Sequence, residues 1–286
     1  MVDSQSIGGP IKRVLVAGAT GGVGQLVVAK LLDKGYTVRA LTRSIEKAKG
    51  LFGDRVEAAV GDIRQLETLG TAVQFVDAII CCTGTTAFPS ERWQFDLPEA
   101  NPLEAALSWG RVYFDADYRR LRSQNNPNSV DAVGVANLVK AAPADLKRFV
   151  FVSSCGVERK DQFPFNLLNA FGVLDAKAKG EEAIQQSGLP YTIIRPARLI
   201  DGPYTSSDLN TLLQAKTDGK RGIVLGTGDR LNGETSRIDV AAACVECLAS
   251  AEPQNAVFEI VNTGDRPDPV DWAQLFSTLP AKQTVS

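Results

Sequence analysis

The chain has 286 residues, 44% of them hydrophobic, and a formal net charge of −2. This length fits one large α/β domain or two small ones, and the composition argues against both a disordered chain and a nucleic-acid-binding protein. Five cysteines without framework spacing argue against a disulfide-stapled fold, and the lack of histidine excludes His-based catalytic triads and His-ligated metal sites. No apolar stretch reaches the roughly 20 residues of a membrane helix, and residues 1–10 have no signal-peptide or transit character. We therefore expect a cytoplasmic protein.

Strands and helices alternate along the chain in the hydrophobic pattern. The predicted strands are residues 14–17, 37–42, 56–60, 76–82, 148–153, 191–195 and 257–261. The predicted helices are residues 25–32, 102 to about 122, 130–142, 176–187, 240–250 and 269–279. Strands separated by helix-length segments are typical of a parallel, doubly wound sheet with right-handed crossovers. The sequence thus predicts one α/β domain over residues 1–286, with a small C-terminal substrate-side region drawn from residues 155–280.

One long segment, residues 84–128, interrupts this alternation. It follows the fourth predicted strand and is far longer than a usual strand-to-helix loop. The segment contains the aromatic residues Trp93, Trp109, Tyr113, Phe114 and Tyr118. Because long ordered loops tend to be functional, we interpret the insert as a lid or a docking surface, with an ornament packed on the core as the alternative.

The stretch from residue 14 to residue 24, Val-Leu-Val-Ala-Gly-Ala-Thr-Gly-Gly-Val-Gly, is the most informative in the chain. Gly18 permits a tight turn after the first strand, Gly21 lets the backbone approach a pyrophosphate, and Gly24 lets the next helix pack closely on the sheet. The free N–H groups at the start of that helix attract phosphates. The predicted phosphate contacts are Gly18, Thr20, Gly21, Gly22, Val23 and Gly24. Strand, glycine turn and helix in this order predict a Rossmann-type dinucleotide-binding fold.

The end of the second predicted strand bears on the choice between NAD and NADP. Folds that prefer NAD place an acidic residue there for the ribose 2′-hydroxyl, but this chain has Arg43, followed by Ser44 and Lys47. A guanidinium forms bidentate, charge-assisted bonds to phosphate, whereas the alternative is an ordinary solvated arginine. The sequence favours NADP(H) as the cofactor.

The ends of the third and fourth strands supply further candidates for the cofactor site. Asp62 is placed to meet the adenine amino group, and Ile63 to flank the adenine ring. Cys82, Thr83 and Gly84 end the fourth strand at the carboxyl edge of the sheet, beside the nucleotide crevice.

Several motifs together resemble the short-chain dehydrogenase/reductase superfamily, in its atypical, NmrA-like branch, over nearly the whole chain. These motifs are Gly18-x-x-Gly21-x-x-Gly24, Gly61-Asp62-Ile63, Val152-Ser153-Ser154, Lys177 with Glu181-Glu182, residues 187–196 and residues 237–241. Residues 83–90 and 201–206 are also similar to a group found in cyanobacteria and plastids, several members of which are linked to photosynthetic membranes or photosystem assembly.

The resemblance implies site residues and also reveals a departure. It implies that Lys177 contacts the nicotinamide ribose, that Ser154 or Ser153 orients the substrate, and that the backbone of Pro196 lines the nicotinamide. The family pattern is Tyr-x-x-x-Lys, in which tyrosine supplies a proton. Val173 stands four residues before Lys177, and valine cannot transfer a proton. The usual proton relay is therefore absent.

This departure leaves two classes of function open. In the first, the protein is an NADPH-dependent reductase of a conjugated acceptor, such as a quinone or flavin, and solvent, Ser154 or Tyr204 completes protonation. In the second, it is a cofactor-binding scaffold or redox sensor that engages a protein partner in the assembly or regulation of a photosynthetic complex. The fold alone does not establish the chemistry.

The cysteines admit redox or metal interpretations that we weigh against packing. Cys244 and Cys247 lie three residues apart on one predicted helix face, and a zinc site would need two more ligands. We therefore expect buried packing and no metal. Cys82 and Cys155 lie nearer the expected nicotinamide, but inert packing is again favoured over a reactive thiol because nothing basic is fixed nearby in sequence.

The remaining candidates concern the substrate and the partner. Arg198 is suited to an acidic substrate or to a neighbouring carboxylate such as Asp201, while Trp93 and Tyr204 are the aromatic residues expected over the substrate pocket. The basic cluster at residues 119–122 ends the inserted helix, where cations are favourable for the helix dipole. The alternative is attachment to an acidic partner or, peripherally, to an anionic thylakoid membrane.

Overall fold

The computed structural model describes residues 9–98, 101–201 and 221–280. Its strands are β1 (Arg13–Ala17), β2 (Thr37–Thr42), β3 (Glu57–Val60), β4 (Ala78–Cys81), β5 (Arg148–Val152), β6 (Tyr191–Pro196), β7 (Arg198–Ile200), β8 (Arg221–Gly226), β9 (Glu234–Ser236) and β10 (Ala256–Asp265). Its α-helices are α1 (Gly22–Asp33), α2 (Ile45–Phe52), α3 (Pro102–Phe114), α4 (Ala116–Arg122), α5 (Val135–Ala141), α6 (Phe165–Leu168), α7 (Val173–Gln185), α9 (Arg237–Ala249) and α10 (Trp272–Ser277). Short 3-10 helices span Gly53–Arg55, Leu66–Thr68 and Glu91–Trp93, and a π-helix spans Asn128–Gly134.

The main sheet has eight strands in the order β3-β2-β1-β4-β5-β6-β10-β8. The seven predicted strands are all present and pair in parallel, which confirms the Rossmann-type α/β fold. The eighth strand, β8, pairs antiparallel with β10, so the prediction of a wholly parallel sheet was wrong at this edge. Its short apolar core, residues 223–225, has no alternation that would mark a strand, and its pairing with β10 is decided by tertiary contact.

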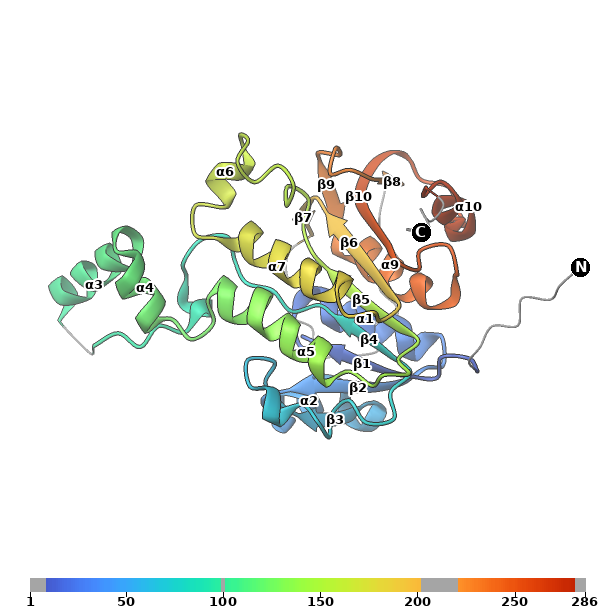
Figure 1. Ribbon diagram of the computed structural model, residues 1–286, viewed down its shortest axis with the longest axis horizontal. Coiled ribbons are helices and arrows are strands. Elements are labelled where there is room, and N and C mark those ends of the chain that lie inside the picture. The colour runs from blue at the N-terminus through green and yellow to red at the C-terminus, as the bar shows by residue number, and fades with distance from the viewer. Residues whose placement is uncertain (1–8, 99–100, 202–220, 281–286) are drawn as a thin grey trace, which may run out of the picture.

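Helices cover both faces of the sheet (Figure 1). Helices α1 and α9 pack on one face, and α5 and α7 lie together on the other. The central strands β4 and β5 are buried along their whole length, as strands covered on both faces should be. This sandwich fixes the carboxyl ends of β1 to β4, where the predicted cofactor residues lie.

Two predicted helices differ from the structure. The single helix expected over residues 102 to about 122 is split into α3 and α4 at Asp115, whose extended backbone (φ −114°, ψ 104°) breaks the helix. The Asp115 side chain then caps α4 by accepting a hydrogen bond from the Tyr118 N–H at 2.9 Å. The helix expected over residues 130–142 begins as the π-helix Asn128–Gly134 before continuing as α5. Such π-helical turns are frequent at functional sites.

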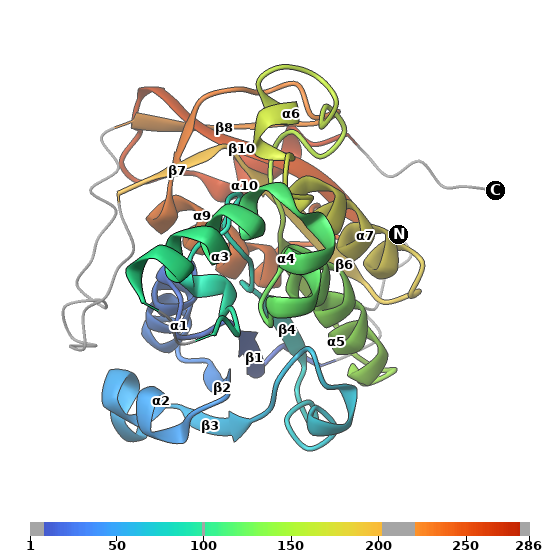
Figure 2. The same cartoon turned by 90° about the vertical axis from the view of Figure 1, so that its left-hand side faces the viewer.

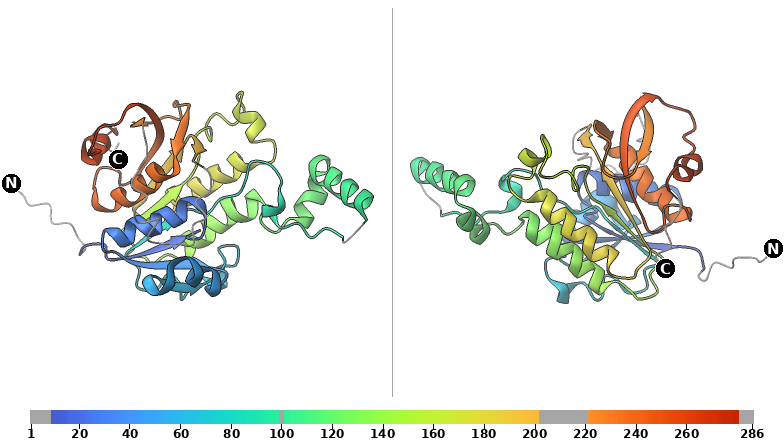
Figure 3. Two further views of the ribbon diagram at one scale, coloured as in Figure 1. Left: turned by 180° about the vertical axis from the view of Figure 1, so that it is seen from behind. Right: turned by 45° about the horizontal axis from the view of Figure 1, so that its top comes forward.

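The insert forms an arm, which we define as residues 96–122. Its two ends are held side by side, since Asp96 N–H donates to the Arg122 carbonyl at 2.8 Å and Asn125 N–H donates to the Trp93 carbonyl at 2.8 Å. Helices α3 and α4 project from the body (Figures 1 and 3), and they lie nearest the viewer in Figure 2. No helix among the described residues is long and apolar enough to span a membrane.

Candidate functional site

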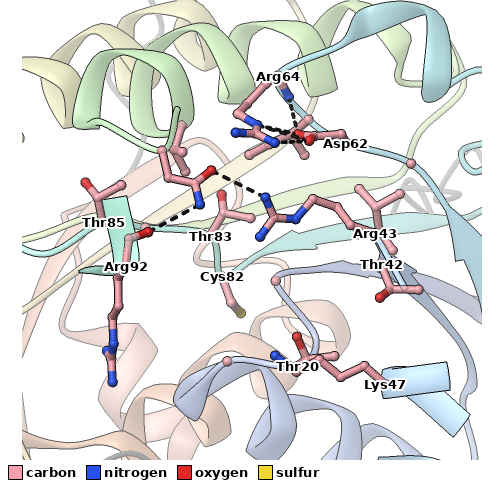
Figure 4. A pocket seen from close by; sticks show the side chains of 18 of the residues that line it. Thr20, Thr42, Arg43, Lys47, Asp62, Arg64, Cys82, Thr83, Thr85 and Arg92 are labelled. Atoms are coloured by element: carbon pink, nitrogen blue, oxygen red, sulfur yellow. Dashed lines mark hydrogen bonds and ion pairs between the residues drawn. The ribbon is translucent and has the colours of Figure 1, made fainter. Parts of the chain in front are cut away.

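A cleft of about 500 Å³ opens at the carboxyl ends of β1 to β4 (Figure 4). The predicted residues that line it are Gly18, Thr20, Gly21, Arg43, Asp62, Ile63, Cys82, Thr83 and Gly84. The other lining residues are Leu41, Thr42, Lys47, Gly61, Arg64, Thr85, Thr86, Arg92, Trp93, Asn125, Val130 and Arg237. Segments from residue 18 to residue 237 thus converge on the edge at which doubly wound sheets bind ligands.

The glycine turn after β1 forms the floor of this cleft. Gly18 has φ of +78°, and a Cβ on Gly24 would lie 2.0 Å from the Gly18 carbonyl oxygen, so both positions require glycine. Helix α1 begins at Gly22 with no side-chain cap and no acidic residue in its first turn. Its first N–H groups are therefore free to bind an anion, and the turn fits a dinucleotide pyrophosphate. Gly22, Val23 and Gly24 form the first turn of α1 and do not line the cleft.

Arg43 extends from the end of β2 into the cleft (Figure 4). Its Nη1 lies 3.3 Å from Gln94 Oε1 and 3.4 Å from Asn125 Oδ1, both of which are neutral acceptors. Ser44 caps α2 by accepting from Lys47 N–H at 3.2 Å, which directs the helix start toward the same end of the strand. Both hydrogen-bond partners of Arg43 among the described residues are neutral, so its positive charge is available to a ligand phosphate.

The carboxylate that lines the cleft, Asp62, is already paired with Arg64. The guanidinium Nη2 lies 2.5 Å from Asp62 Oδ2, and Nε lies 2.9 Å from Oδ1. Burial alone would raise the pKa of Asp62, but the hydrogen bonds and charge of Arg64 outweigh it and lower that pKa below its ordinary value. Both carboxylate oxygens of Asp62 already accept from Arg64, so the contact with an adenine amino group remains a prediction. Ile63 lines the cleft beside it.

Lys177, on α7, is buried behind the cleft and does not line it. Its ammonium Nζ lies 2.9 Å from Asp131 Oδ1, 3.3 Å from the Thr83 carbonyl and 3.0 Å from the Val152 carbonyl. The predicted contact with the nicotinamide ribose therefore remains a prediction.

Two serines follow β5, and they have different surroundings. Ser154 is half-buried and its hydroxyl donates to the Cys155 carbonyl at 2.9 Å. Ser153 is buried and its hydroxyl donates to the Glu181 carboxylate, which also accepts from Arg195 Nη2 at 2.6 Å. Burial by itself would lower the pKa of Arg195, but its bonds to Glu181 and Glu158 raise it above the ordinary value. Ser153 is thus part of a buried ionic network, which leaves Ser154 as the less constrained hydroxyl.

Two further positions considered from the sequence, Pro196 and Val173, are both buried. Pro196 is buried at the end of β6 and its carbonyl accepts from Cys155 N–H at 2.9 Å, so its role toward the nicotinamide stays a prediction. Val173 begins α7 and packs with Val157 and Leu174 in a small apolar cluster. Tyr204 lies outside the described residues.

The burial of the cysteines favours a packing role over a redox or metal-binding role. Cys244 and Cys247 are fully buried in the core beneath the sheet, as the packing interpretation predicted. Burial raises the pKa of Cys155 to about 12 and that of Cys81 to about 11, which keeps both thiols protonated near neutral pH. Cys82 lines the cleft.

Two buried acids lie near Cys155, and one of them, Asp229, has a structural role. Cys155, Asp229 and Glu259 place potential metal-ligand atoms within 4.8 Å of one another. The Asp229 carboxylate, however, accepts backbone N–H groups of Gly156 at 2.7 Å and Glu158 at 2.8 Å. These bonds hold the loop that follows β5 in place.

The insert contributes more to the cleft than its sequence indicates. Trp93, which was predicted to lie over the substrate pocket, is 1% exposed. Its Nε1 donates to Thr86 Oγ1 at 3.0 Å, so the loop after β4 holds the indole ring in place. Arg92 and Asn125 enter the cleft from the two ends of the arm and were not predicted. In the sequence, nothing marks these two residues except that they lie in an unusually long connection. They come together only because the two segments that carry them pair in the folded protein.

Arg198 and three arginines of the arm have acidic or aromatic partners. Arg198 pairs with Glu234, a carboxylate other than the Asp201 considered from sequence. Within the arm, Arg120 lies 3.0 Å from Asp117, Arg122 lies 3.4 Å from Asp96, and Arg119 lies over the Phe171 ring. These pairs are exposed and each contributes little to stability.

The comparison with known proteins identifies the family. The sequence profile described as NAD(P)H-binding matches residues 18–251, which include the glycine turn and most of the sheet. The chain belongs to this NAD(P)H-binding family. The resemblance to atypical short-chain dehydrogenases/reductases, including a plastid and cyanobacterial group, is thereby confirmed.

Relatives named for different functions are similar to this chain. Sanguinarine reductase from Eschscholzia californica is 32% identical over 280 residues, which cover 93% of this chain and 95% of that protein. The chloroplast protein TIC 62 of Arabidopsis thaliana is 31% identical over 87% of this chain but only 35% of its own length. A photosystem II assembly factor from Cyanophora paradoxa is 27% identical over 87% of this chain and 63% of its own length. The relatives therefore include a reductase as well as a photosystem assembly factor.

Solved structures support the fold. A putative NAD-dependent epimerase/dehydratase from Bacillus halodurans superposes with a TM-score of 0.65 at 23% identity, covering 94% of this chain and all of that one. A short-chain dehydrogenase/reductase from Veillonella parvula, solved with NADP, gives a TM-score of 0.54 at 17% identity, covering 90% of this chain and 98% of that one.

Proposed function

We propose that the cleft binds NADP(H) in preference to NAD(H). The observation that carries this proposal is Arg43, which follows β2, where a 2′-phosphate would lie, and whose two hydrogen-bond partners among the described residues are neutral, at 3.3 and 3.4 Å. The carboxylate of the cleft, Asp62, is paired with Arg64 and follows β3, so it does not supply the acceptor that a ribose 2′-hydroxyl would need. Lys47 and Arg92 add further positive charge to the lining.

We further propose that the protein reduces a conjugated acceptor, such as a quinone or flavin, with solvent completing protonation. The bound nicotinamide would supply a hydride. Val173 cannot donate a proton. We assign the orientation of the acceptor to Ser154, a half-buried hydroxyl that follows β5 and is not among the residues that line the cleft. The similarity to sanguinarine reductase along nearly the full chain favours turnover of a conjugated compound.

The test is NADPH oxidation, followed by the loss of NADPH absorbance, with quinones, flavins and planar iminium compounds as acceptors. Turnover above the uncatalysed rate that falls in Ser154→Ala supports the reductase. The matched control is Glu182→Gln, because this exposed side chain lies on the far part of α7 and its variant should keep the full rate. Tight NADPH binding with no turnover on any of these acceptors contradicts the reductase and leaves the scaffold function.

We propose as the alternative a non-catalytic NADP(H)-binding scaffold or redox sensor, which engages a protein partner through the insert. The arm supports it, because α3 carries Leu103, Leu107 and Phe114 on one face at helical spacing, and these side chains are 72%, 63% and 93% exposed. The similarity to a photosystem II assembly factor agrees with such a role, and peripheral association with a thylakoid membrane belongs to the same proposal.

Removal of residues 97–121 separates the two roles of the insert. Because Asp96 and Arg122 are already hydrogen-bonded at 2.8 Å, a short glycine linker can join them and leave Arg92, Trp93 and Asn125 in the chain. We expect NADPH affinity to stay within about twofold while association with a partner or membrane is lost. A collapse of NADPH affinity would instead identify the arm as a lid or a structural brace.

A further inference from the structure

A fully buried carboxylate, Asp131, lies directly behind the cleft. It projects from the π-helix that precedes α5, is 0% exposed, and contacts two other segments. Its Oδ1 lies 2.9 Å from Lys177 Nζ on α7. Its Oδ2 accepts hydrogen bonds from Thr85 Oγ1 at 2.6 Å and from Thr85 N–H at 3.1 Å, in the loop after β4. Asp131 therefore joins a lysine that does not line the cleft to a threonine that does.

Glycines make room for this arrangement on two sides. A Cβ on Gly180 would lie 2.5 Å from the Asp131 carbonyl oxygen, so α7 can approach the π-helix closely only because that position is glycine. A Cβ on Gly84 would lie 3.3 Å from Lys177 Nζ. The two glycines thus let α7 approach the π-helix and the loop after β4 approach Lys177.

The direction of each hydrogen bond follows from the charges. A carboxylate paired with an ammonium has no proton to give, so Thr85 must donate its hydroxyl proton to Asp131. Only the lone pairs of Thr85 Oγ1 then remain for a ligand. Lys177 Nζ forms an ion pair with Asp131 and donates hydrogen bonds to the carbonyl groups of Thr83 and Val152. On the cleft side, this site presents an acceptor and not a cation.

The strand order says which part of the cofactor would meet Thr85. In the order β3-β2-β1-β4, Arg43 follows β2 and the glycine turn follows β1. A dinucleotide with its 2′-phosphate at Arg43 and its pyrophosphate at the turn directs its other half toward the loop after β4. That half is the nicotinamide riboside, whose hydrogen-bond donors are the ribose hydroxyls and the carboxamide.

We propose that Thr85 accepts a hydrogen bond from a donor of the nicotinamide riboside, and that Asp131 is the positioning residue that orients Thr85 and retains Lys177 behind the cleft. This inference rests on the proposed binding of NADP(H). It assigns Lys177 an indirect role, through Asp131, in place of the direct ribose contact that the sequence implies.

The test compares NADPH dissociation constants, measured by fluorescence titration, for the wild type and two variants at Thr85. Thr85→Val keeps the shape but removes the hydroxyl, and Thr85→Ser is the matched control that keeps it. We expect the first to weaken NADPH about threefold to tenfold, the range for one lost hydrogen bond, and the second to stay within about twofold. Equal affinity in all three proteins would overturn the proposal.

A cofactor analogue identifies the donor. The 3-acetylpyridine analogue of NADPH carries a methyl ketone where the carboxamide stands, and so has no amide donor. If the carboxamide is the donor, Thr85→Val leaves the affinity for this analogue unchanged. If a ribose hydroxyl is the donor, the variant weakens the analogue as much as it weakens NADPH. Both results support an acceptor at Thr85 and separate its two ligand groups.

A variant at Asp131 tests the positioning role. In Asp131→Asn an amide can donate to Thr85, which would turn the threonine hydroxyl toward the cleft as a donor. We expect weaker NADPH binding, with little further loss when Thr85→Val is added, because both changes remove the same acceptor. Fully additive losses would contradict the coupling. Should Asp131→Asn fail to fold, the two Thr85 variants decide the proposal by themselves.

The outcome also separates this inference from the proposed function. A wild-type protein that does not bind NADPH contradicts the function. A wild type that binds NADPH, together with a Thr85→Val variant that binds it equally well, contradicts only the role given to Thr85 and Asp131.

Discussion

Replacement of Arg43 by glutamine isolates the charge that we assign to the 2′-phosphate. The partners of this guanidinium are the neutral groups Gln94 and Asn125, at 3.3 and 3.4 Å, so its removal leaves no buried carboxylate unpaired. The variant should therefore fold with unchanged stability. A hydrogen bond to a charged group contributes about 1.5–3 kcal/mol, so the affinity for NADPH should fall by roughly 10- to 150-fold.

NADH provides the internal comparison, because it lacks the 2′-phosphate. Its affinity should change less than about twofold. Arg120→Gln is the matched control, since it makes the same change in net charge on α4, where the side chain is 74% exposed. Isothermal titration of both cofactors against the three proteins gives the numbers. Equal losses for NADPH and NADH, or no loss for either, would refute the assignment of Arg43 to the phosphate.

Three further predictions concern the turn, the core and the cleft. Gly24→Ala places a Cβ 2.0 Å from the Gly18 carbonyl oxygen, so calorimetry should show a lower melting temperature and titration a weaker NADPH complex. An unchanged melting temperature and an unchanged NADPH affinity would show that α1 can shift to make room for the methyl group. Glu181→Gln removes the charged partner of the buried Arg195 guanidinium and should lower the free energy of unfolding, measured in urea, by about 3 kcal/mol. The exposed Glu182→Gln should change it by less than about 0.5 kcal/mol. Equal effects of the two changes would show that the buried ion pair contributes nothing. Cys82 lines the cleft while the other four cysteines are buried, so iodoacetamide should modify it first and NADPH should slow that reaction; labelling indifferent to NADPH would contradict its position.

Much of the fold follows from local pattern. The seven parallel strands are apolar runs separated by helix-length segments, and each is found within a few residues of its predicted bounds. The pattern failed where the chain departs from that rhythm. Strand β8 is recognised only by its antiparallel pairing with β10, and the break at Asp115 depends on a cap that competes with a continuous helix.

The candidate site divides in the same way. The glycine turn and Arg43 lie next to strand ends, so the order of residues is enough to bring them to one edge of the sheet. Arg92 and Asn125 could not be assigned, because they reach the cleft through the pairing of two segments and stand 33 residues apart along the chain. The comparisons confirm the NAD(P)H-binding family, while the roles of individual residues stay predictions that the experiments above test.

The sequence by itself determined the phosphate-binding turn, since the spacing of Gly18, Gly21 and Gly24 is a local constraint on backbone conformation. It also determined that the usual tyrosine is missing, because Val173 occupies that position. Only the tertiary structure decided what Lys177 contacts. Its partner Asp131 lies on a different element, far away along the chain, and the buried ion pair forms because α7 packs against the π-helix. Long-range packing therefore decides which side of the cleft each charge faces.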